Sequence, residues 1–423
     1  MTWRSVSAAL WAVCAVGLAY CPAADDQPAK TKPGQETAGA SVQYLPLDAP
    51  AGISQAVVVT GQSLVHTRQL LPLDRAGKPV GEGSIDKQIE QVLDNLSAVL
   101  SDSGSGLDKL VRVNVYAITH QTVDRVREML SKRVDAAVRP VMTAVLTPLP
   151  HRKALVAVDA VAVSSEKSLS VVLKRCEAVA GDKDFADAAV LPTGGVAYLS
   201  GLPEESDVAV PAVTKSMTGL WKTLGLLKIP AAQVVQLKVF LRPASSADQV
   251  AGKLKEFFPG QLTPPVIFVE WNAVPQAEIE LIAQLPATDK PAQGLELYNP
   301  PDVPRSAVFS RVALVRSQQR IYTSGLYARE VKNAASRPGG EAQAGDVFAQ
   351  LKTILEQTGS DLRHLAKATY FVCDPFASRG FDVARPALLD PARPPAASLL
   401  MVHGVGKPGR TLTMDMIAVP SGK

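Results

Sequence analysis

Histidine is often used for proton transfer and metal binding near neutral pH, and the five histidines of this 423-residue chain are scattered along it (His66, His120, His151, His364 and His403). They show no HxH, HExxH or cysteine–histidine spacing, so we expect no metal site. The sequence also has no GxSxG motif, and no phosphate loop or dinucleotide-binding fingerprint between a strand and a helix, so we expect no cofactor. Any chemistry must therefore depend on residues that the larger pattern of the chain brings together.

The charge balance disfavours nucleic acid as a partner. The chain has 44 basic and 40 acidic residues, a formal net charge of +4 and only 5% aromatic residues. Proteins that bind nucleic acid by neutralising phosphates usually carry a larger basic excess, and base stacking requires aromatic side chains. We therefore expect a small-molecule ligand and no nucleic acid.

The N-terminus has the pattern of a secretory signal peptide, residues 1–24. Arg4 precedes an apolar stretch, Ala8 to Ala19, which is too short to cross a bilayer comfortably, and small residues follow it. A short membrane anchor and a lipoprotein attached through Cys21 are the alternatives. Residues 25–42 are polar and predict a flexible leader. We expect an exported protein, periplasmic or extracellular, with no membrane attachment after cleavage.

Two cysteines, Cys176 and Cys373, remain beyond the predicted signal peptide. Two cysteines in a large exported chain do not make a disulfide framework. They could form one disulfide or stay as buried thiols, and the sequence leaves both open because the separation of the two residues in the fold is not known at this point.

A helix pattern followed by a strand pattern recurs three times in the chain. In the first instance, apolar residues between Ile89 and Leu100 recur with the period of one helix face. A strand-like run then opens ten residues after the last of them, at Leu110. The same ten-residue offset appears in each instance: Leu100 to Leu110, Leu224 to Val234 and Leu355 to Leu365. This recurrence indicates three copies of one structural unit.

Each copy also has apolar strands before its first helix and at its end, which gives the order ββαβαββ and an α+β fold. The copies, called repeats 1, 2 and 3 below, span residues 43–165, 168–287 and 295–421. Each is long enough to hold its own core.

Two details refine the prediction for these elements. In the run 110–118 of repeat 1, valines alternate with Arg112 and Asn114, which predicts a strand with one solvent-facing side. In repeat 3, Pro386 interrupts the segment that corresponds to the second helix, so no long helix is expected there.

Taken together, these marks resemble the RidA/YjgF family of reactive-intermediate imine/enamine deaminases. The resemblance rests on the threefold unit, on strands that end in Ser-Gly, on terminal strands that end in Ile-Ala or Val-Ala, and on the proline segment PVMTAV at 140–145. It implies a chorismate-mutase-like fold. Members of this family are typically homotrimers with ligand clefts between subunits, so three fused copies imply one chain that folds as an intramolecular pseudo-trimer. We therefore expect a monomer with internal threefold pseudo-symmetry.

The resemblance also implies which residues would form the clefts. An Arg in a Pro-x-Arg-Ser/Thr motif binds the substrate carboxylate, a Glu on the last strand orients the attacking water, and Ser-Gly completes the cleft. The Ser-Gly positions predict binding residues at Ser200, Gly201, Ser324 and Gly325, whereas repeat 1 has Thr67-Arg68, with Arg68 in place of the glycine. At the Arg position stand Met142, Val266 and Ala397, and at the Glu position stand Ala157, Glu278 and Thr413.

No repeat therefore keeps both the Arg and the Glu that the resemblance implies, and three functions remain open. The first is a catalytically degenerate protein that binds a small molecule in the clefts between repeats. The second is an active 2-imino acid or enamine deaminase, a hydrolase, in which Glu278 works with a displaced cation such as Arg393 in the only Pro-Ala-Arg of the chain. The third is ribonuclease-like RNA binding, which the naming of the family suggests.

Overall fold

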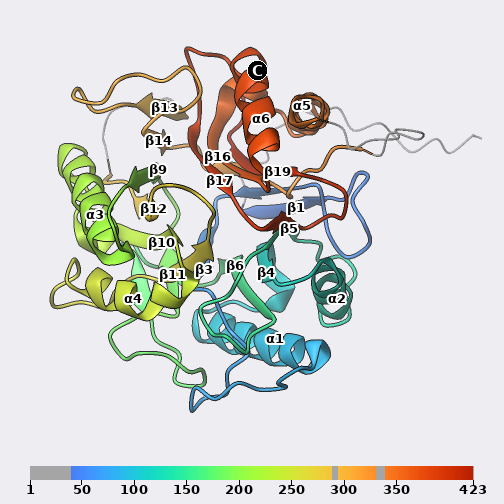
Figure 1. Cartoon of the computed structure of the whole chain (residues 1–423), viewed down its shortest axis with the longest axis vertical. Coiled ribbons are helices and arrows are strands. Elements are labelled where there is room, and N and C mark those ends of the chain that lie inside the picture. The colour runs from blue at the N-terminus through green and yellow to red at the C-terminus, as the bar shows by residue number, and fades with distance from the viewer. Residues whose placement is uncertain (1–39, 288–293, 330–338, 423) are drawn as a thin grey trace, which may run out of the picture. The chain divides into compact units, whose positions relative to one another are not determined.

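The computed structural model describes residues 40–287, 294–329 and 339–422, which belong to one compact unit, Ala38–Lys423 (Figure 1). The predicted signal peptide and most of the predicted leader lie outside the described residues. The first strand, β1, begins at Ser41, so residues 41 and 42 are part of a strand and not of a flexible leader. Among the described helices, none combines the length and the apolar character that crossing a membrane requires.

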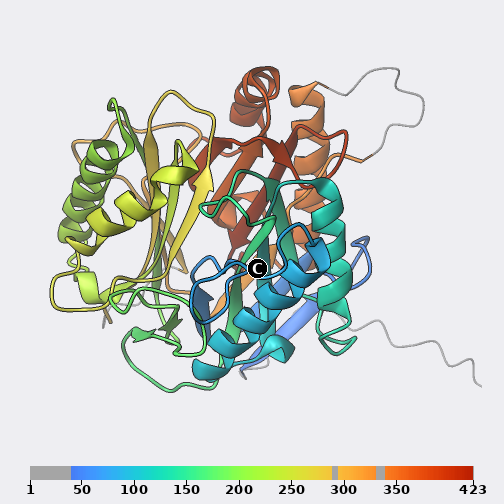
Figure 2. The same cartoon turned by 60° about the horizontal axis from the view of Figure 1, so that its bottom comes forward.

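Three mixed sheets, each covered by two helices, make up this unit, with the helices at the periphery and the strands toward the centre (Figures 1 and 2). The first sheet has the order β18-β5-β4-β6-β3-β8-β7 and packs against α1 (Ile85–Asp102) and α2 (His120–Ser131). Its strands are β3 (Ser63–Thr67), β4 (Leu110–Ala117), β5 (Val141–Leu146), β6 (Val156–Ser164), β7 (Val172–Lys174), β8 (Ala188–Leu191) and β18 (Gly404–Val405).

The second sheet has the order β11-β10-β12-β9-β14-β13 and packs against α3 (Ala209–Leu226) and α4 (Ala247–Lys255). Its strands are β9 (Val196–Glu204), β10 (Val234–Leu241), β11 (Val266–Glu270), β12 (Ala277–Gln284), β13 (Leu295–Tyr298) and β14 (Val312–Val315). The third sheet has the order β1-β2-β15-β19-β16-β17 and packs against α5 (Gly340–Gln357) and α6 (Pro375–Leu388). Its strands are β1 (Ser41–Leu45), β2 (Ala56–Thr60), β15 (Gln319–Thr323), β16 (Leu365–Val372), β17 (Ala396–Met401) and β19 (Leu412–Ala418).

The helix-to-strand unit forms in all three repeats as its periodicity predicts. The apolar face between Ile89 and Leu100 is buried against the first sheet, and the corresponding faces of α3 and α5 are buried against the second and third. A short 3-10 turn joins each of these helices to its strand: Leu107–Lys109, Ala231–Gln233 and Leu362–His364. The chain is thus an α+β protein with three chorismate-mutase-like units.

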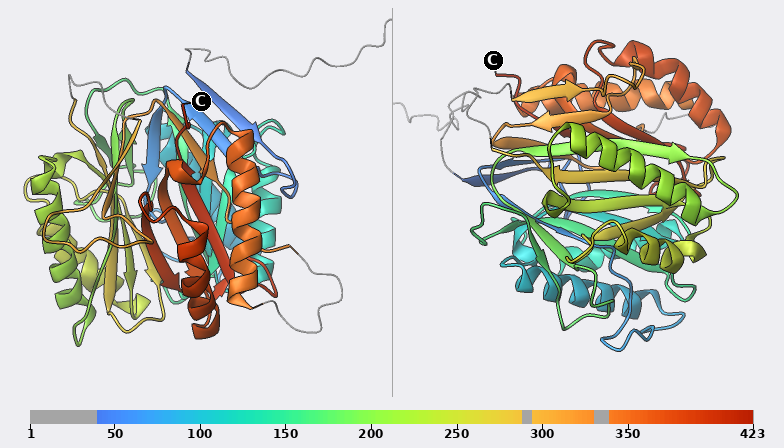
Figure 3. Two further views of the ribbon diagram at one scale, coloured as in Figure 1. Left: turned by 90° about the horizontal axis from the view of Figure 1, so that it is seen from above. Right: turned by 90° about the vertical axis from the view of Figure 1, so that its left-hand side faces the viewer.

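The N-terminal hairpin of each repeat joins the sheet of the preceding repeat. Strand β8 of repeat 2 pairs with β3 of repeat 1, and β14 of repeat 3 pairs with β9 of repeat 2. Strand β2 of repeat 1 pairs with β15 of repeat 3, which closes the ring, and the β1–β2 hairpin lies beside strands of repeat 3 (Figure 3). The short link that follows β2 meets the short link between β14 and β15, because Gly61 N donates a hydrogen bond to Gln318 O at 2.9 Å. Each sheet therefore contains strands of more than one repeat, and the first sheet, which includes β18 of repeat 3, contains strands of all three.

The helix α6 corrects the prediction that repeat 3 lacks a long second helix. It has 14 residues, with Pro386 inside its last turn. Asp374 caps the N-terminus by accepting hydrogen bonds from the backbone N–H groups of Phe376 and Ala377. Because Pro386 stands near the end, it removes only one late hydrogen bond, and the buried Phe381 anchors the helix before that point.

The prediction of a solvent-facing side on the 110–118 strand is wrong, because every residue of β4 is buried. Val113 and Val115 pack against α1 and α2, while Val111, Arg112 and Asn114 point to the region where the three sheets meet. A strand with one polar side is compatible with a solvated face or with a buried polar centre, and the alternation alone does not separate the two.

Candidate functional site

Around the ring, the Ser-Gly segment of one repeat, or its equivalent, contacts the next repeat at three junctions, where the family resemblance places the ligand clefts. We call them the 1–2, 2–3 and 3–1 clefts after the two repeats that contribute. The strand registers place Met142, Val266 and Ala397 at one equivalent position, opposite Val113, Leu237 and Ala368. They place Ala157, Glu278 and Thr413 at another, opposite Tyr116, Phe240 and Phe371.

In the 2–3 cleft, Ser200 and Gly201 of β9 hold the edge of repeat 3. Ser200 Oγ donates a hydrogen bond to Ser310 O at 2.5 Å and accepts one from Ala397 N at 2.8 Å. Gly201 N donates to Ser398 Oγ at 3.1 Å. Only glycine fits at position 201, because an added Cβ would lie 1.7 Å from Glu278 Oε1. The Ser-Gly segment therefore leaves the space that the Glu278 carboxyl occupies.

Glu278 is a buried carboxyl with an unusual acidity. Its side chain extends from β12 into the cleft, and the residue is 5% exposed. Burial raises its pKa from 4.5 to about 7 because the charged form loses solvation. The Ser398 hydroxyl and the positive charges of Arg311 and Lys367 oppose this rise in pKa, while Glu280 adds to it. Both the protonated and the ionised form of this carboxyl are therefore accessible near neutral pH.

Arg311 places a guanidinium in the same cleft, at a position that no motif in the sequence indicates. The residue directly precedes β14, the strand that repeat 3 contributes to the sheet of repeat 2. It is 8% exposed, and its Nη1 donates to Gly201 O at 2.9 Å. Burial lowers the pKa of Arg311, and the nearby Glu278 and Glu204 carboxylates oppose this shift. A cation and a carboxyl thus lie in one cleft, although the cation does not come from the expected Pro-x-Arg motif.

Arg393, the cation that we predicted as a partner of Glu278, lies elsewhere. Its Nε donates to the backbone oxygen of Arg363 at 3.1 Å at an exposed position. The structure brings Glu278 together with Ser200, Gly201 and Ser398, and the guanidinium beside them is that of Arg311.

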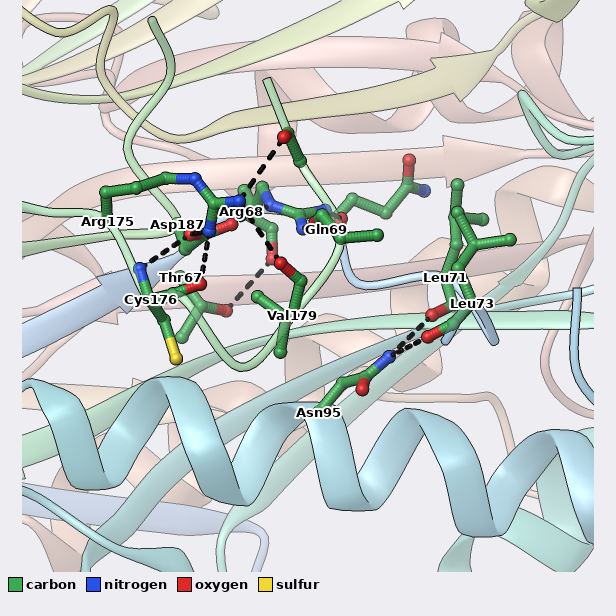
Figure 4. Close-up of polar contacts among 12 residues, drawn as sticks. Thr67, Arg68, Gln69, Leu71, Leu73, Asn95, Arg175, Cys176, Val179 and Asp187 are labelled. Atoms are coloured by element: carbon green, nitrogen blue, oxygen red, sulfur yellow. Dashed lines mark hydrogen bonds and ion pairs between the residues drawn. The ribbon is translucent and has the colours of Figure 1, made fainter. Parts of the chain in front are cut away.

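The 1–2 cleft contains an ion-pair cluster around the buried Asp187 (Figure 4). Asp187 Oδ1 lies 2.6 Å from Arg68 Nε, and Asp187 Oδ2 pairs with Arg175 and accepts from Cys176 N at 2.9 Å. In repeat 1, Arg68 occupies the serine position and Gln69 the glycine position, one residue later than we aligned them. Equivalent backbone hydrogen bonds in the three repeats show this: Arg68 N donates to Asp187 O, Ser200 N to Arg311 O and Ser324 N to Gln55 O. The Gln69 side chain fills the cleft by bonding to the Phe268 backbone.

This cluster fixes the β7–β8 hairpin of repeat 2 onto repeat 1, so we expect Asp187→Ala to destabilise the protein by about 2 kcal/mol. The substitution leaves two arginines, whose side chains are 21% and 16% exposed, without their shared acid. Urea unfolding measures the change. Asp302→Ala, which breaks the exposed ion pair with Lys222, is the matched control and is expected to have no measurable effect. Equal stability of the two variants would contradict the structural role of Asp187.

The 3–1 cleft is held by neutral groups. Ser324 Oγ donates to Ser54 O at 2.6 Å and accepts from Met142 N at 2.9 Å. Thr413 Oγ1 donates to Leu326 O at 3.0 Å, and the Tyr327 hydroxyl donates to Ala144 O at 3.4 Å. The positions of the Arg and the Glu are thus occupied by an apolar side chain and a hydroxyl that is already bonded, and this cleft has neither a carboxyl nor a guanidinium at those two positions.

The described part of the chain contains no group of three His, Cys, Asp or Glu residues that could hold a metal ion. Cys176 is a buried thiol, and the two cysteines do not form a disulfide with each other. Burial raises the pKa of the Cys176 thiol, which disfavours the reactive thiolate form.

Comparisons with known proteins agree with this architecture. The family model described as Endoribonuclease L-PSP matches residues 46–164 and 303–420, in repeats 1 and 3. The RutC family protein slr0709 of Synechocystis is 30% identical over 124 residues, which are 29% of this chain and 94% of that protein. Protein DfrA of Myxococcus xanthus is 32% identical over 111 residues, 26% of this chain and 84% of that protein.

The solved structures that are similar to this chain each cover about 30% of it. A putative endoribonuclease from Thermotoga maritima is 29% identical, covers 29% of this chain and 98% of its own, and has a TM-score of 0.23. A YjgF family member from Neisseria meningitidis is 19% identical, covers 30% and 97%, and has a TM-score of 0.22. Because the family model matches more than half of the chain and the relatives align over most of their own length, the chain belongs to the RidA/YjgF family and carries its fold in repeated form.

Proposed function

We propose that the protein hydrolyses a small imine or enamine at a single site, the 2–3 cleft, and that the other two clefts serve only to hold the repeats together. The observation that carries this proposal is the convergence of Glu278 and Arg311 beside Ser200, Gly201 and Ser398. The 1–2 and 3–1 clefts have Ala157 and Thr413 at the position of Glu278, so they lack the acid–base group that this chemistry needs.

The chemistry of the proposed reaction needs one anion-binding group and one group that accepts and returns a proton. The Arg311 guanidinium would bind the carboxylate of a 2-imino acid through its remaining N–H donors. Glu278 in its ionised form would take a proton from water as the water oxygen bonds to the imine carbon, and would return it to the nitrogen. In the resulting carbinolamine, Glu278 would then take the hydroxyl proton and pass it to the nitrogen, so that breaking the carbon–nitrogen bond releases ammonia and leaves a carbonyl compound. A carboxyl with a pKa near the working pH suits both steps.

The second candidate is binding without turnover, and one observation favours it. Ala397 stands where the family motif has its Arg, and Arg311 Nη1 is already bonded to Gly201 O. A guanidinium held in this way has fewer donors for a substrate. In this case the cleft would bind a small anionic or neutral ligand and would not convert it.

An ammonia-release assay separates the two candidates. The full chain is mixed with 2-imino acids generated in situ by an amino-acid oxidase, and ammonia release is measured. We expect turnover by the wild-type protein and a loss of about 100-fold or more in kcat for Glu278→Gln. We expect Arg311→Met to raise KM as well. Arg316→Met is the control, because Arg316 lies on the same hairpin but contacts Pro286 O. No turnover, together with ligand binding that Arg311→Met abolishes, would favour the second candidate, and the absence of both would reject the site.

The ribonuclease activity that the family description names is not extended to this chain, because the charge balance and the aromatic content disfavour phosphate and base binding. Export remains a proposal that rests on the pattern around Arg4, and sequencing the N-terminus of the protein made in its own cell tests it. A monomeric state is likewise proposed, on the ground that the strand exchange closes the ring within one chain.

A further inference from the structure

A hollow of about 540 Å³ lies where residues of all three repeats meet at one end of the strands. It is found at the carboxyl ends of two pairs of parallel strands: Ile118 follows β4, Leu146 ends β5, Pro243 lies two residues after β10, and Glu270 ends β11. His403 adds a side chain from repeat 3. None of the residues that the structure places in the three clefts lines this hollow, so it is a separate feature of the protein.

The size and the walls of the hollow suit a small organic molecule. Ligand pockets in proteins usually have volumes of about 300–1,000 Å³ and mostly apolar linings with a few polar groups. The apolar part of this lining comes from repeats 1 and 2 and includes Ile118, Leu146, Leu149, Leu155 and Pro243. Ile118 is 45% exposed although it is a large aliphatic residue. An apolar body bound here would cover this side chain, and removing apolar surface from water favours binding.

Glu270, the carboxylate of the lining, is already bonded within the protein. Its Oε2 accepts a hydrogen bond from Ala244 N at 2.6 Å, and its Oε1 lies 3.3 Å from His403 Nε2. The backbone of Glu270 is held as well, because Thr147 Oγ1 accepts from Glu270 N and donates to Glu270 O, both at 3.1 Å. Each carboxylate oxygen thus has a donor of its own, so Glu270 serves to hold the wall of the hollow together.

The donors that stay available belong to the loop between β5 and β6. No hydrogen bond or ion pair holds the Arg152 guanidinium within the described residues. The neighbouring Lys153, by contrast, is paired with Glu82 at 2.6 Å. His151 Nδ1 accepts a hydrogen bond from Lys153 N at 3.3 Å, which places the proton of the neutral ring on Nε2 and makes that atom a donor. The hollow therefore offers the Arg152 guanidinium and a ring N–H beside an apolar wall.

We propose that this hollow binds a small carboxylate with an apolar body, such as an aryl-substituted or branched aliphatic acid. The Arg152 guanidinium would bind the carboxylate, with the His151 ring N–H as a second donor, and the apolar body would lie against Ile118, Leu155 and Pro243. A neutral molecule of the same shape would leave Arg152 without a counter-charge, and a small ion such as acetate would leave the apolar wall uncovered. The ligand would also bridge the repeats, because residues of all three line the hollow.

A fluorinated probe tests this site on the full chain. The anion para-fluorophenylacetate has the proposed chemistry, and its binding can be measured from its fluorine NMR signal. A molecule of this size is expected to bind with a Kd on the order of 1 mM. Arg152→Met should weaken binding about fivefold or more, and the uncharged amide of the same probe should bind the wild-type protein about fivefold more weakly. Ser245→Trp, which puts a large side chain on the lining, should abolish binding.

Two other arginine variants are the matched controls. Arg139 precedes β5, at the opposite end of that strand, and donates to Ala136 O at 3.0 Å, so Arg139→Met should keep the wild-type affinity. Arg311→Met should also keep it, because Arg311 belongs to the 2–3 cleft. Binding that is lost in Arg311→Met and kept in Arg152→Met would place the probe in the 2–3 cleft and overturn the proposal. No binding at concentrations well above the expected Kd, or equal affinity of Arg152→Met and the wild type, would overturn it as well, whatever the ammonia-release assay shows.

Discussion

A chain that begins at Gly61, without β1 and β2, is expected to lose the folded state of repeat 3, although the deleted residues belong to repeat 1. Strand β2 pairs with β15 from Gln319 to Thr323, and Val58 is buried in the core of repeat 3. Val57 and Val59 are buried where the three sheets meet. Burying one valine contributes about 1.5–3 kcal/mol, so the deletion removes an amount comparable to the total stability of a typical domain.

Hydrogen exchange locates the effect of this deletion. Protection should be lost in β15 and β19, while β10 and β12 of repeat 2 should keep more of theirs. A chain that begins at Ala40 retains both strands and is the control. If exchange instead accelerated in β3 and β6 of repeat 1 alone, the hairpin would belong to its own repeat and the strand exchange would be wrong.

Two single substitutions give the same information with less disruption. Val58 on β2 packs in the core of repeat 3, and Val190 on β8 packs in the core of repeat 1. Val58→Asp should therefore increase exchange in the third sheet, and Val190→Asp in the first. The two variants are matched because they change the same residue type at equivalent places of two hairpins. Measuring the mass in solution on the same samples tests whether the ring closes within one chain.

The sequence predicted the elements that depend on local periodicity. The face between Ile89 and Leu100 and the ten-residue offset to Leu110 are properties of neighbouring residues, and both appear in the structure as predicted. The prediction that repeat 3 has no long second helix failed for α6, because it took account of Pro386 but not of the N-terminal cap at Asp374. Position within a helix decides the cost of a proline.

The partners of each strand could not be predicted in the same way. Arg311 reaches the Glu278 cleft only because β14 crosses into the sheet of repeat 2, and no local pattern shows on which sheet a hairpin adds its strands. The buried polar centre did leave a signal, since Asp159, Glu280 and Asp415 stand at one position of the three repeats. An acid at the same inward position in every repeat suggests a shared polar interior, whereas alternation within one strand suggests only two different faces.

The stability of the protein should fall as the pH rises from about 4.5 to about 7 through the titration of Glu278. The pKa of this carboxyl is about 7 in the folded protein, above its ordinary value of 4.5. Between these values the unfolded chain releases the proton while the folded chain keeps it, so the contribution to the unfolding free energy is full below pH 4.5 and is lost above pH 7. The total is about 3 kcal/mol. Glu278→Gln cannot ionise and should not show this loss, so its stability relative to the wild type should grow across this range. Urea unfolding at several pH values measures the difference.

Glu296→Gln, at an exposed position of β13, is the control and should follow the wild-type curve. A constant difference between Glu278→Gln and the wild type would mean that the pKa of Glu278 is not raised in the folded protein, and the carboxylate would then be a weaker base than the proposed reaction needs.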